Sequence, residues 1–575
     1  MMKLFRFIKP FRKAVIFVLI LTFLQVLANL YLPTLMSDIV DIGIVNGDIS
    51  YIVKVGGIML GVAALGVIAS IAASFYSAKS AMGFGKILRE QVFTHVEKFS
   101  LRGFDQIGTA SLITRTTEDI TQLQQVLMIM MRIMIMAPMM AIGGIILAVS
   151  KDAQLSLVII AAMPVLALAI FIIARKGMPL FKALQKKLDQ LNLIQREGLT
   201  GIRVIRSFNR IDHEKKRFNE ANLGYADTAV KANRIMSVMM PVMMLSLNFS
   251  MIAIVWFGGI QISHGNLQVG DLMAFLQYAM QIMMALMMGS MMFMMIPRAQ
   301  VSAGRVNEVL ETVPDIKDPK QGMNTDRRKG NVQFQNVTFS YPGAEKPAID
   351  HISFNAGPGE ITAIIGGTGS GKSTLINLIP RFYDVDGGSL LINGVDVRDM
   401  KQTELRSKIG YVPQKAVLFT GTVSDNIRYG KEEATDEEIR HAADVAQADE
   451  FITNMEEGFD SKVTQGGTNV SGGQKQRISI ARALVKRPEI YVFDDSFSAL
   501  DFKTDAKLRA ALRQEITEST VFIVAQRVST VMDADRIIVL DEGQVAGIGK
   551  HRELMETCEV YREIVSSQLS EEESA

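Results

Sequence analysis

Six long apolar stretches dominate the first half of the chain, and each is long enough to cross a lipid bilayer. They occupy residues 14–35, 52–74, 133–149, 155–174, 236–260 and 272–296. An α-helix rises about 1.5 Å per residue and the hydrocarbon layer is about 30 Å thick, so about 20 mostly apolar residues span it. The sequence therefore predicts a membrane domain of six helices.

The distribution of charge predicts a second, soluble domain. The formal net charge of the 575 residues is only +2, yet charged residues are scarce in long parts of the first half and dense near the end. A chain of this length also exceeds what one compact core accommodates. We expect a transmembrane domain at 1–300, a polar linker at 301–330 and a soluble domain at 331–575.

The charges that flank the first span predict its orientation. It is preceded by the basic residues Lys3, Arg6, Lys9, Arg12 and Lys13 and followed by the acids Asp38, Asp41 and Asp48. Basic residues favour the cytosolic side, so the N-terminus is expected in the cytosol, and an even number of spans returns the C-terminus there. The first apolar run has no small-residue cleavage pattern and is interpreted as a retained span.

Helical patterning continues beyond the predicted bilayer in two places, at residues 83–100 and 184–228. We expect two helical extensions into the cytosol, whose turns near 105–111 and 208–213 are placed to touch the soluble domain. The alternative is a pair of long amphipathic surface helices.

Methionine is concentrated in spans three, five and six, which suits a cavity that repacks around varied ligands. Lipid-facing or helix-packing methionine is the alternative.

A phosphate-binding loop follows a predicted strand at residues 361–365. Its residues of interest are Gly366, Thr368, Gly369, Ser370, Gly371, Lys372, Ser373 and Thr374, and an apolar helical stretch comes next. The glycines let backbone N–H groups close around phosphate oxygens, Lys372 reaches the outer phosphates and Ser373 ligates magnesium. This order of strand, loop and helix predicts a site for ATP and Mg²⁺.

Further motifs surround this loop in the sequence. A buried-strand pattern at 490–494 ends in Asp494, a second magnesium ligand, and about twenty residues earlier stand Ser471, Gly472, Gly473 and Gln474. Gln414 follows Tyr411-Val-Pro, Asp501 ends Ser498-Ala-Leu-Asp, and Tyr341 precedes the phosphate loop. Together these motifs resemble the nucleotide-binding domain of ATP-binding cassette (ABC) proteins along its whole length.

The six-span half also resembles that family, and the chain looks like a bacterial half-size ABC exporter. The resemblance implies an all-α membrane domain with cytosolic helical extensions, followed by an α/β P-loop nucleotide-binding domain. It also implies a dimer that sandwiches two ATP molecules, each between one chain's phosphate loop and the other's signature motif. The chain would then sit in the bacterial cell membrane as a multi-pass protein.

The resemblance assigns roles residue by residue. Tyr341 would stack on adenine. Ser373, Gln414 and Asp494 would surround Mg²⁺, and Gln414 would also sense the γ-phosphate. The signature Ser471, Gly472, Gly473 and Gln474 would cap the partner's ATP, with Asp501 beside it.

Two positions depart from the family pattern. Competent members have a glutamate after the magnesium-side aspartate and a histidine in the switch loop, whereas this chain has Asp495 and Gln526. Aspartate is one methylene shorter, and a displacement of about 1 Å at a reacting centre costs on the order of a hundredfold in rate. Glutamine donates a hydrogen bond but cannot become cationic as histidine does.

Both departures belong to this chain's own composite site, while the signature that it would lend to a partner is intact. The combination resembles the degenerate-site subunit of a heterodimeric exporter, and a slow homodimer is the alternative. The expected partners are a second half-transporter, the lipid bilayer and a hydrophobic or amphipathic small molecule, with no nucleic acid. A flippase for lipids or lipid-linked molecules would use the same motor.

Composition also limits other kinds of site. The sole cysteine, Cys558, excludes an intrachain disulfide, and the six histidines show no metal-ligand spacing. A non-transporting ATPase sensor is a reading from a different class, but no signalling domain follows the cassette.

Overall fold

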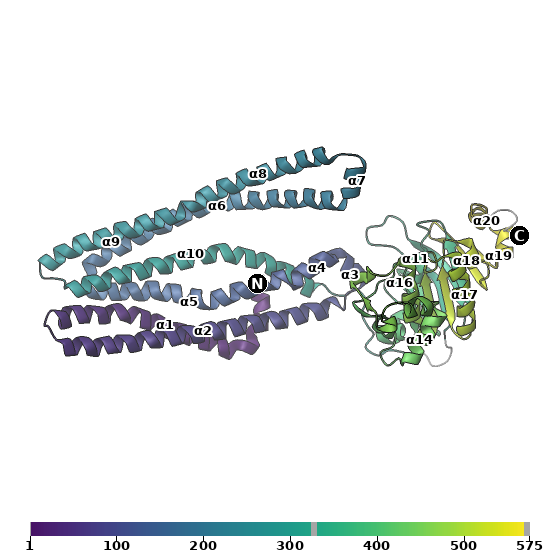
Figure 1. Cartoon of the computed structure of the whole chain (residues 1–575), viewed down its shortest axis with the longest axis horizontal. Helices are drawn as coiled ribbons and strands as arrows, with labels where there is room; N and C mark the ends of the chain where they lie inside the picture. Colours follow the sequence, from purple (N-terminus) through teal and green to yellow (C-terminus); the bar gives the residue numbers. More distant parts are fainter. Residues whose placement is uncertain (1, 324–329, 569–575) are drawn as a thin grey trace. The chain divides into compact units, whose positions relative to one another are not determined.

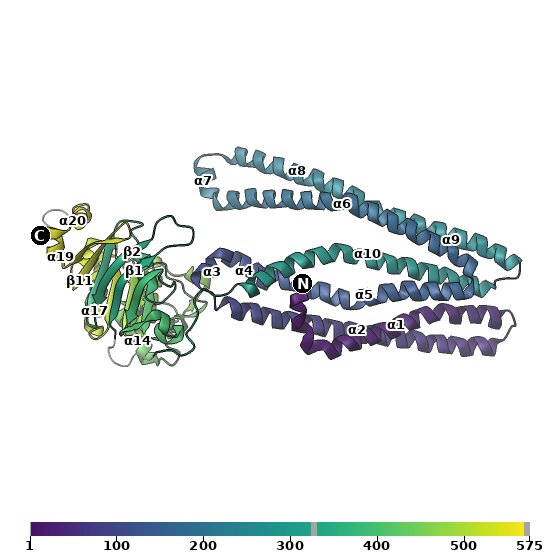
Figure 2. The same ribbon diagram turned by 180° about the vertical axis from the view of Figure 1, so that it is seen from behind.

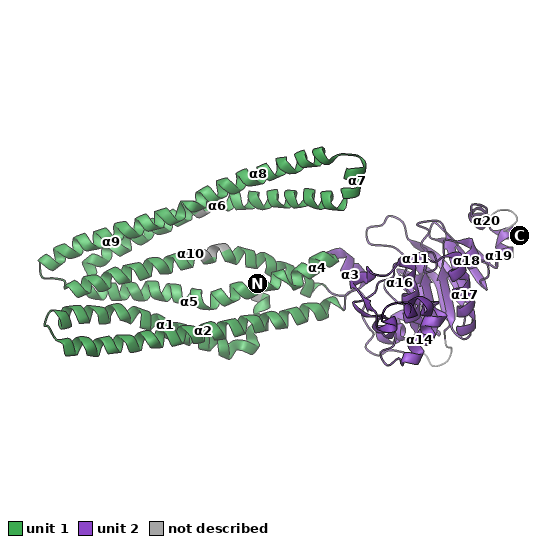
Figure 3. Cartoon of the chain, viewed as in Figure 1, with its two compact units in different colours: residues 1–97, 108–312 green, residues 98–107, 313–575 purple. Residues whose placement is uncertain are grey.

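The computed structural model describes the backbone of residues 2–323 and 330–568, without the side chains of residues 2, 174, 290, 291, 293 and 294. It divides the chain into two compact units (Figure 3). Unit 1 comprises Met1–Glu97 and Gly108–Thr312, and unit 2 comprises Lys98–Ile107 and Val313–Ala575. Arg327, Arg328 and Lys329 of the expected linker lie outside the described residues, and the last helix of unit 1 continues to Glu311.

Unit 1 is entirely helical in its described part. Its elements are the 3₁₀ helix η1 (Met2–Phe11), α1 (Arg12–Asp38), the π-helical turn η2 (Ile39–Ile44), α2 (Ile49–Val96), α4 (Thr109–Thr116), α5 (Glu118–Lys151), α6 (Ala153–Thr200), α7 (Ile202–Ser207), α8 (Ile211–Ser237), α9 (Met239–Ser263) and α10 (Val269–Glu311). Among the described residues, six helical segments are long and apolar enough to cross a membrane: Lys3–Ile44, Ile49–Val96, Thr109–Lys151, Ala153–Thr200, Ile211–Ser263 and Val269–Gly289. The prediction of six spans is confirmed.

Small residues let the spanning helices approach closely. A Cβ atom added to Gly143 of α5 would lie 2.5 Å from the Leu30 side chain of α1, and one added to Gly144 would lie 2.8 Å from Ile282 of α10. Apolar helices in lipid gain stability mainly from such tight packing, because lipid tails are as apolar as the side chains. The three helices therefore form a closely packed core of unit 1.

The helices extend well past the predicted spans, as the helical patterning at residues 83–100 and 184–228 led us to expect. Helix α2 continues to Val96 and α6 to Thr200. Helix α7 and the adjoining parts of α6 and α8 reach away from the other helices of unit 1 (Figures 1 and 2). The predicted turn near 105–111 is wrong in detail: these residues belong to two short helices, α3 (Leu101–Ile107) and α4, separated at Gly108, whose φ is 78°.

A polar cluster ties three helices together at the end of the bundle where α5 meets α6. The Lys151 ammonium lies 2.6 Å from Oδ1 of Asp271, and the Ser37 hydroxyl donates to the same oxygen at 2.7 Å. Oδ1 of Asp41 accepts from the backbone N–H of Gly270 at 2.6 Å. The cluster thus joins α1 and η2 to α5 and α10 through charged groups that are mostly shielded from solvent.

A second polar contact joins α5 and α10 at the opposite end of the bundle. Oδ1 of Asp119 accepts from the Ser302 hydroxyl at 2.7 Å and lies 2.9 Å from Nη2 of Arg305. The Asp119 side chain is only 4% exposed. A buried carboxylate needs such partners, because the desolvation cost of an unpaired charge is several kcal/mol.

The described residues of unit 2 form three sheets. Their strands are β1 (Val332–Phe339), β2 (Ile349–Ala356), β3 (Ile361–Gly366), β4 (Gly387–Ile392), β5 (Val395–Asp396), β6 (Ile409–Val412), β7 (Gly421–Thr422), β8 (Lys462–Val463), β9 (Ile490–Asp494), β10 (Thr520–Val524), β11 (Arg536–Asp541) and β12 (Gln544–Gly549). The largest sheet has the order β12-β11-β3-β10-β9-β6 and is parallel except for β12. An antiparallel sheet has the order β2-β1-β4-β5. The predicted α/β nucleotide-binding fold is confirmed.

Helices and a second sheet cover the two faces of the main sheet. The helices of unit 2 besides α3 are α11 (Lys372–Leu378), α12 (Gln402–Ser407), α13 (Val423–Arg428), α14 (Asp436–Val445), α15 (Asp449–Thr453), α16 (Gly472–Leu484), α17 (Phe502–Glu515), α18 (Val528–Val531), α19 (His551–Thr557) and α20 (Glu559–Ser566). Successive strand residues point to opposite faces, so Ala363 and Ile365 join one hydrophobic core while Ile364 joins the other. Burial on both faces explains the continuous apolar runs of β3 and β9.

We predict that Arg305→Ala lowers the free energy of unfolding of the full chain by about 1–2 kcal/mol. The change leaves Asp119 buried beside a single hydroxyl, and the cost is discounted because Arg305 is 46% exposed. SDS titration of the protein in detergent micelles measures it. Arg298→Ala is the matched control, since Arg298 is exposed on the same helix with no ion pair among the described residues. Equal losses in both variants would contradict the role of the Asp119 contact.

Candidate functional site

The phosphate loop lies between the carboxyl end of β3 and the first residue of α11. Gly369 and Gly371 have φ values of 84° and 95°, in the left-handed region that side chains disfavour. A Cβ atom on Gly371 would lie 2.6 Å from the Ala348 carbonyl oxygen, whereas one on Gly369 would meet nothing within 4 Å. The loop thus packs tightly on one side and offers open backbone on the other, as a phosphate cradle requires.

Lys372 holds its ammonium over this loop. Its Nζ donates to the carbonyl oxygens of Gly366 at 2.9 Å and Gly367 at 2.6 Å. Burial lowers the pKa of Lys372, and the nearby Asp495 and Asp494 carboxylates partly oppose that shift. An anion bound in the loop would favour the protonated amine, so the site suits a charged phosphate.

Ser373 and Asp494 meet beside the loop. The Ser373 hydroxyl donates to Oδ1 of Asp494 at 3.0 Å. Burial raises the pKa of Asp494; the Ser373 hydrogen bond opposes this, and the Asp495 charge adds to it. Hydroxyl and carboxylate oxygens are the hard donors that Mg²⁺ takes, so these two residues fit the ion. The third predicted ligand, Gln414, hydrogen-bonds to Asp495 instead, where its Nε2 donates to Oδ2 at 3.2 Å.

The two residues that depart from the family pattern contact one another. Nε2 of Gln526 donates to Oδ2 of Asp495 at 2.9 Å. Together with Gln414, this gives one carboxylate oxygen two amide donors, which fills both of its lone-pair positions. The sequence placed both residues in one site, and the structure shows that they form one hydrogen-bonded group.

Tyr341 lies against the helix that follows the loop. Its hydroxyl is 3.1 Å from Oγ1 of Thr374, and its ring makes an edge contact with Tyr383 at 5.6 Å between centroids. Tyr341 as a whole is 38% exposed, which is compatible with stacking on a base. Burial raises the pKa of Tyr383, with smaller contributions from Tyr341 and from Asp105 of α3. Sequence reasoning missed Tyr383, because no motif marks it.

The signature residues form the capped start of α16. The Ser471 hydroxyl accepts from the N–H of Gln474 at 3.3 Å, and the Gln474 side chain accepts from the N–H of Ser471 at 2.9 Å. Gly473 packs near the Ala499 carbonyl. Asp501 caps α17 by accepting from the Thr504 N–H at 3.0 Å, and this bond and the Thr504 hydroxyl lower the pKa of Asp501. In the described part of the chain, no hydrogen bond or ion pair joins these residues to the phosphate loop.

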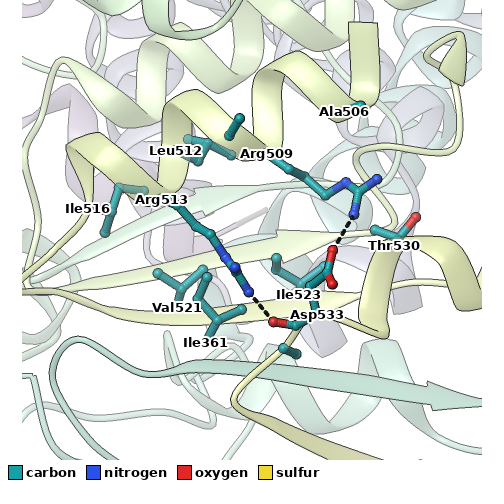
Figure 4. Close-up of a pocket in the computed structure, with 12 residues that line it drawn as sticks. Ile361, Ala506, Arg509, Leu512, Arg513, Ile516, Val521, Ile523, Thr530 and Asp533 are labelled. Carbon is teal, nitrogen blue, oxygen red and sulfur yellow. Dashed lines mark hydrogen bonds and ion pairs between the residues drawn. The ribbon is translucent and has the colours of Figure 1, made fainter. Parts of the chain in front are cut away.

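A cavity of about 250 Å³ lies elsewhere in unit 2, between α17 and the main sheet (Figure 4). Its floor includes Ile361 and Val521, and two arginines of α17 cross its mouth toward Asp533. Arg509 lies 3.9 Å from the Asp533 carboxylate, and Arg513 donates to the Asp533 carbonyl. None of the predicted nucleotide-site residues lines this cavity, and the two arginines link α17 to Asp533.

Three features of unit 2 define an ABC ATPase. They are the phosphate loop at the end of a central parallel strand, the magnesium-side aspartate and the separate, capped signature helix. The same chain carries six membrane-spanning helices. Residues 15–286 match the ABC transporter transmembrane region, and residues 349–498 match the ABC transporter family. The chain belongs to the ABC transporter family as a half-size exporter, in which ATP hydrolysis is coupled to transport.

Individual relatives cover the chain almost completely. An uncharacterized ABC transporter ATP-binding protein of Mycobacterium tuberculosis is 42% identical over 98% of this chain and 97% of its own length. YgaD of Bacillus subtilis, provisionally named a multidrug export ATP-binding/permease protein, is 32% identical over 99% of both chains. The solved structure of a bacterial Atm1-family ABC exporter with ATP bound superposes with a TM-score of 0.82 at 27% identity, covering 97% of this chain and 99% of that one.

We predict that magnesium-dependent nucleotide binding weakens as the pH falls through the raised pKa of Asp494. Only the ionised carboxylate binds Mg²⁺ well, and a raised pKa makes protonation compete at a higher pH than for an ordinary aspartate. The measurement is the ratio of ATP affinities with Mg²⁺ and with EDTA across a pH series. Asp494→Asn is the control, because ATP itself also titrates and does so equally in both proteins. If the affinity ratio of this variant shows the same pH dependence as that of the wild type, Asp494 does not have the proposed role.

Proposed function

We propose that this chain is the degenerate-site half of a heterodimeric exporter that expels hydrophobic or amphipathic compounds from the cell. The observation that carries the proposal is the hydrogen-bonded group of Asp495, Gln526 and Gln414. This chain retains ATP in its own weak site and lends its signature motif to a competent site on the partner.

The chemistry of the Asp495 group supports slow hydrolysis. A general base must lie within hydrogen-bond reach of the attacking water. Asp495 is one methylene shorter than the family's glutamate, and its Oδ2 is already occupied by two amide donors. Gln526 carries no exchangeable charge, so it cannot stabilise the product phosphate as a cation. These effects together are expected to slow water attack by at least about a hundredfold.

The loop that cradles the phosphates does not depend on that group for its shape. Lys372 and Ser373 and the open backbone of the loop remain in place, so ATP binds without prompt turnover. Ser373 and Asp494 would hold Mg²⁺, which supplies charge neutralisation for the phosphates when bound. The bound nucleotide stabilises a closed dimer only to the extent that it binds the closed state more tightly than the open state.

The signature helix supports the asymmetric arrangement. Ser471 and Gln474 cap one another and preorganise the start of α16, so the N–H groups of Gly472 and Gly473 remain available to a partner's phosphate. A homodimer would contain two weakened sites. A partner with a full catalytic set would instead combine with this signature to make one efficient site.

Closure of the nucleotide domains must then be passed to the spans. Helix α3 belongs to unit 2, where its Arg102 lies 3.7 Å from Asp315. Its Asp105 lies close enough to Tyr383 to contribute to the raised pKa of that residue. Tyr383 in turn contacts Tyr341, the residue expected to stack on adenine. We infer that α3 moves with its own nucleotide domain. Both chain ends lie in the cytosol in this arrangement, and the protein resides in the cell membrane.

The methionines of the spans support an adaptable apolar path. Met240, Met244 and Met284 are exposed on unit 1, whereas Met131, Met243 and Met283 are buried. The side chains of Met291 and Met294 lie outside the described residues. Flexible thioethers on open helix faces suit substrates of varied shape, and the provisional name of YgaD agrees with a drug-like substrate.

We predict negligible ATP turnover by this chain alone and substantial turnover with a partner half that carries glutamate and histidine. Because the partner's site does the hydrolysis, Asp495→Asn should leave the turnover of the pair almost unchanged. The matched variant is the partner's own glutamate changed to glutamine, which should abolish it. Robust turnover by the chain alone that Asp495→Asn removes would establish a self-sufficient homodimer instead.

We also predict that the double variant Asp495→Glu, Gln526→His raises turnover in the chain's own site by at least about tenfold, whereas either single change gains less. The two side chains share a hydrogen bond, so their effects should be non-additive. ATPase assays of the four combinations measure this.

The substrate class can be tested by the ATPase activity of the assembled transporter. Stimulation of this activity by many unrelated apolar compounds supports drug export, and stimulation by lipid alone indicates a flippase.

A further inference from the structure

The C-terminal segment reaches back to the switch loop through one side chain. Oε1 of Gln568, two residues beyond α20, accepts from the backbone N–H of Val528 at 2.9 Å. Its Nε2 donates to the backbone carbonyl of Gln526 at 2.8 Å. One amide thus bridges the loop on both sides of Arg527 and uses its donor and its acceptor together.

Helix α20 fixes the position of that amide. Tyr561 and Val565 are fully buried and belong to the same hydrophobic core as Val528 and Val531 of α18. The Tyr561 hydroxyl lies 2.8 Å from Nδ1 of His551 in α19. The backbone N–H of Gln568 donates to the Val565 carbonyl at 3.0 Å. The bridge therefore starts from a packed element.

The bridged loop carries the contacts that shape the nucleotide site. The side chain of Gln526 donates to Asp495, and Nη2 of Arg527 donates to the Ser498 carbonyl at 3.3 Å. In the described residues, Gln568 is the hydrogen-bond partner of both the Gln526 carbonyl and the Val528 N–H. Without it, two backbone groups beside Asp495 would depend on solvent, and the loop would sample more conformations.

We propose that Gln568 is a positioning residue that holds the switch loop so that Gln526 and Asp495 face the γ-phosphate end of the nucleotide site. It acts through the loop backbone and does not touch the nucleotide. The consequence is selective: binding of ATP depends on Gln568, whereas binding of ADP, which lacks the γ-phosphate, does not. The inference needs only nucleotide binding by this chain, so it applies to a homodimer and to a heterodimer.

The test measures the preference for MgATP over MgADP at this chain's own site in the full assembly. Photolabelling with radioactive 8-azido-ATP, resolved by chain on a gel, is competed with unlabelled MgATP or MgADP. Gln568→Ala should weaken MgATP binding about three- to tenfold, as expected for one or two net hydrogen bonds, with little change for MgADP. Ser567→Ala is the matched control, because within residues 2–323 and 330–568 its hydroxyl hydrogen-bonds to the Ile564 carbonyl and not to the switch loop.

Gln568→Glu separates positioning from general stability. An ionised carboxylate accepts from Val528 but repels the Gln526 carbonyl, whereas a neutral carboxylic acid offers one acceptor and one donor. The MgATP preference of this variant should therefore recover, relative to Gln568→Ala, as the pH falls toward the ordinary glutamate pKa of about 4.3. A merely structural role would not produce that recovery.

Equal weakening of MgATP and MgADP, or no change in either, would overturn the proposal. If Gln568→Ala lowers the melting temperature markedly, the relative pH recovery of Gln568→Glu decides the matter, and its absence counts against positioning. A negative result leaves the heterodimer proposal standing, because that rests on partner dependence and on Asp495.

Discussion

The parallel register of three central strands is the constraint on which the nucleotide site depends. Ile364 of β3 pairs with Val524 of β10, and Val524 pairs with Asp494 of β9, so the three strands end side by side. The phosphate loop, the magnesium-side carboxylate and the switch loop therefore leave the sheet at one edge. A shift of one residue in any strand would exchange side chains between the two hydrophobic cores, so packing on both faces protects the geometry of the site.

Much of the fold could be predicted from the sequence, because hydrophobic length and motif order are local signals. The spans followed from stretch length, and β3 and β9 from apolar runs next to polar motifs. The extensions of α2 and α6 beyond the spans were also predictable, because helical patterning continues through residues 83–100 and 184–228. The interval 105–111 looked like a turn because it is polar, yet short helices form there on either side of Gly108. The Lys151–Asp271 contact joins residues 120 positions apart and carries no sequence signal.

The candidate site shows the same limit at the level of single hydrogen bonds. The resemblance to ABC proteins assigned Asp495 and Gln526 to one site, but only the structure shows that the shortened acid and the neutral amide hydrogen-bond to each other. The two departures are therefore mutually compatible: a polar pair replaces a catalytic pair without leaving a buried group unpaired. Gln568, 42 residues after Gln526, extends this group to the end of the described chain. A site that has lost its water-activating chemistry can thus keep an ordered architecture.

The cluster of Ser37, Asp41, Lys151 and Asp271 affects how readily the helices separate at the end of the bundle where α5 meets α6. Lys151 and Asp271 are about one-fifth exposed, so moving α10 away from α1 and α5 there would first require water to solvate an ammonium and a carboxylate. The free-energy cost of separating these two charges depends on the ionic strength of the solution beside them. In the proposed transport cycle, the ions of the solution at that end of the spans would thereby influence how readily these helices separate.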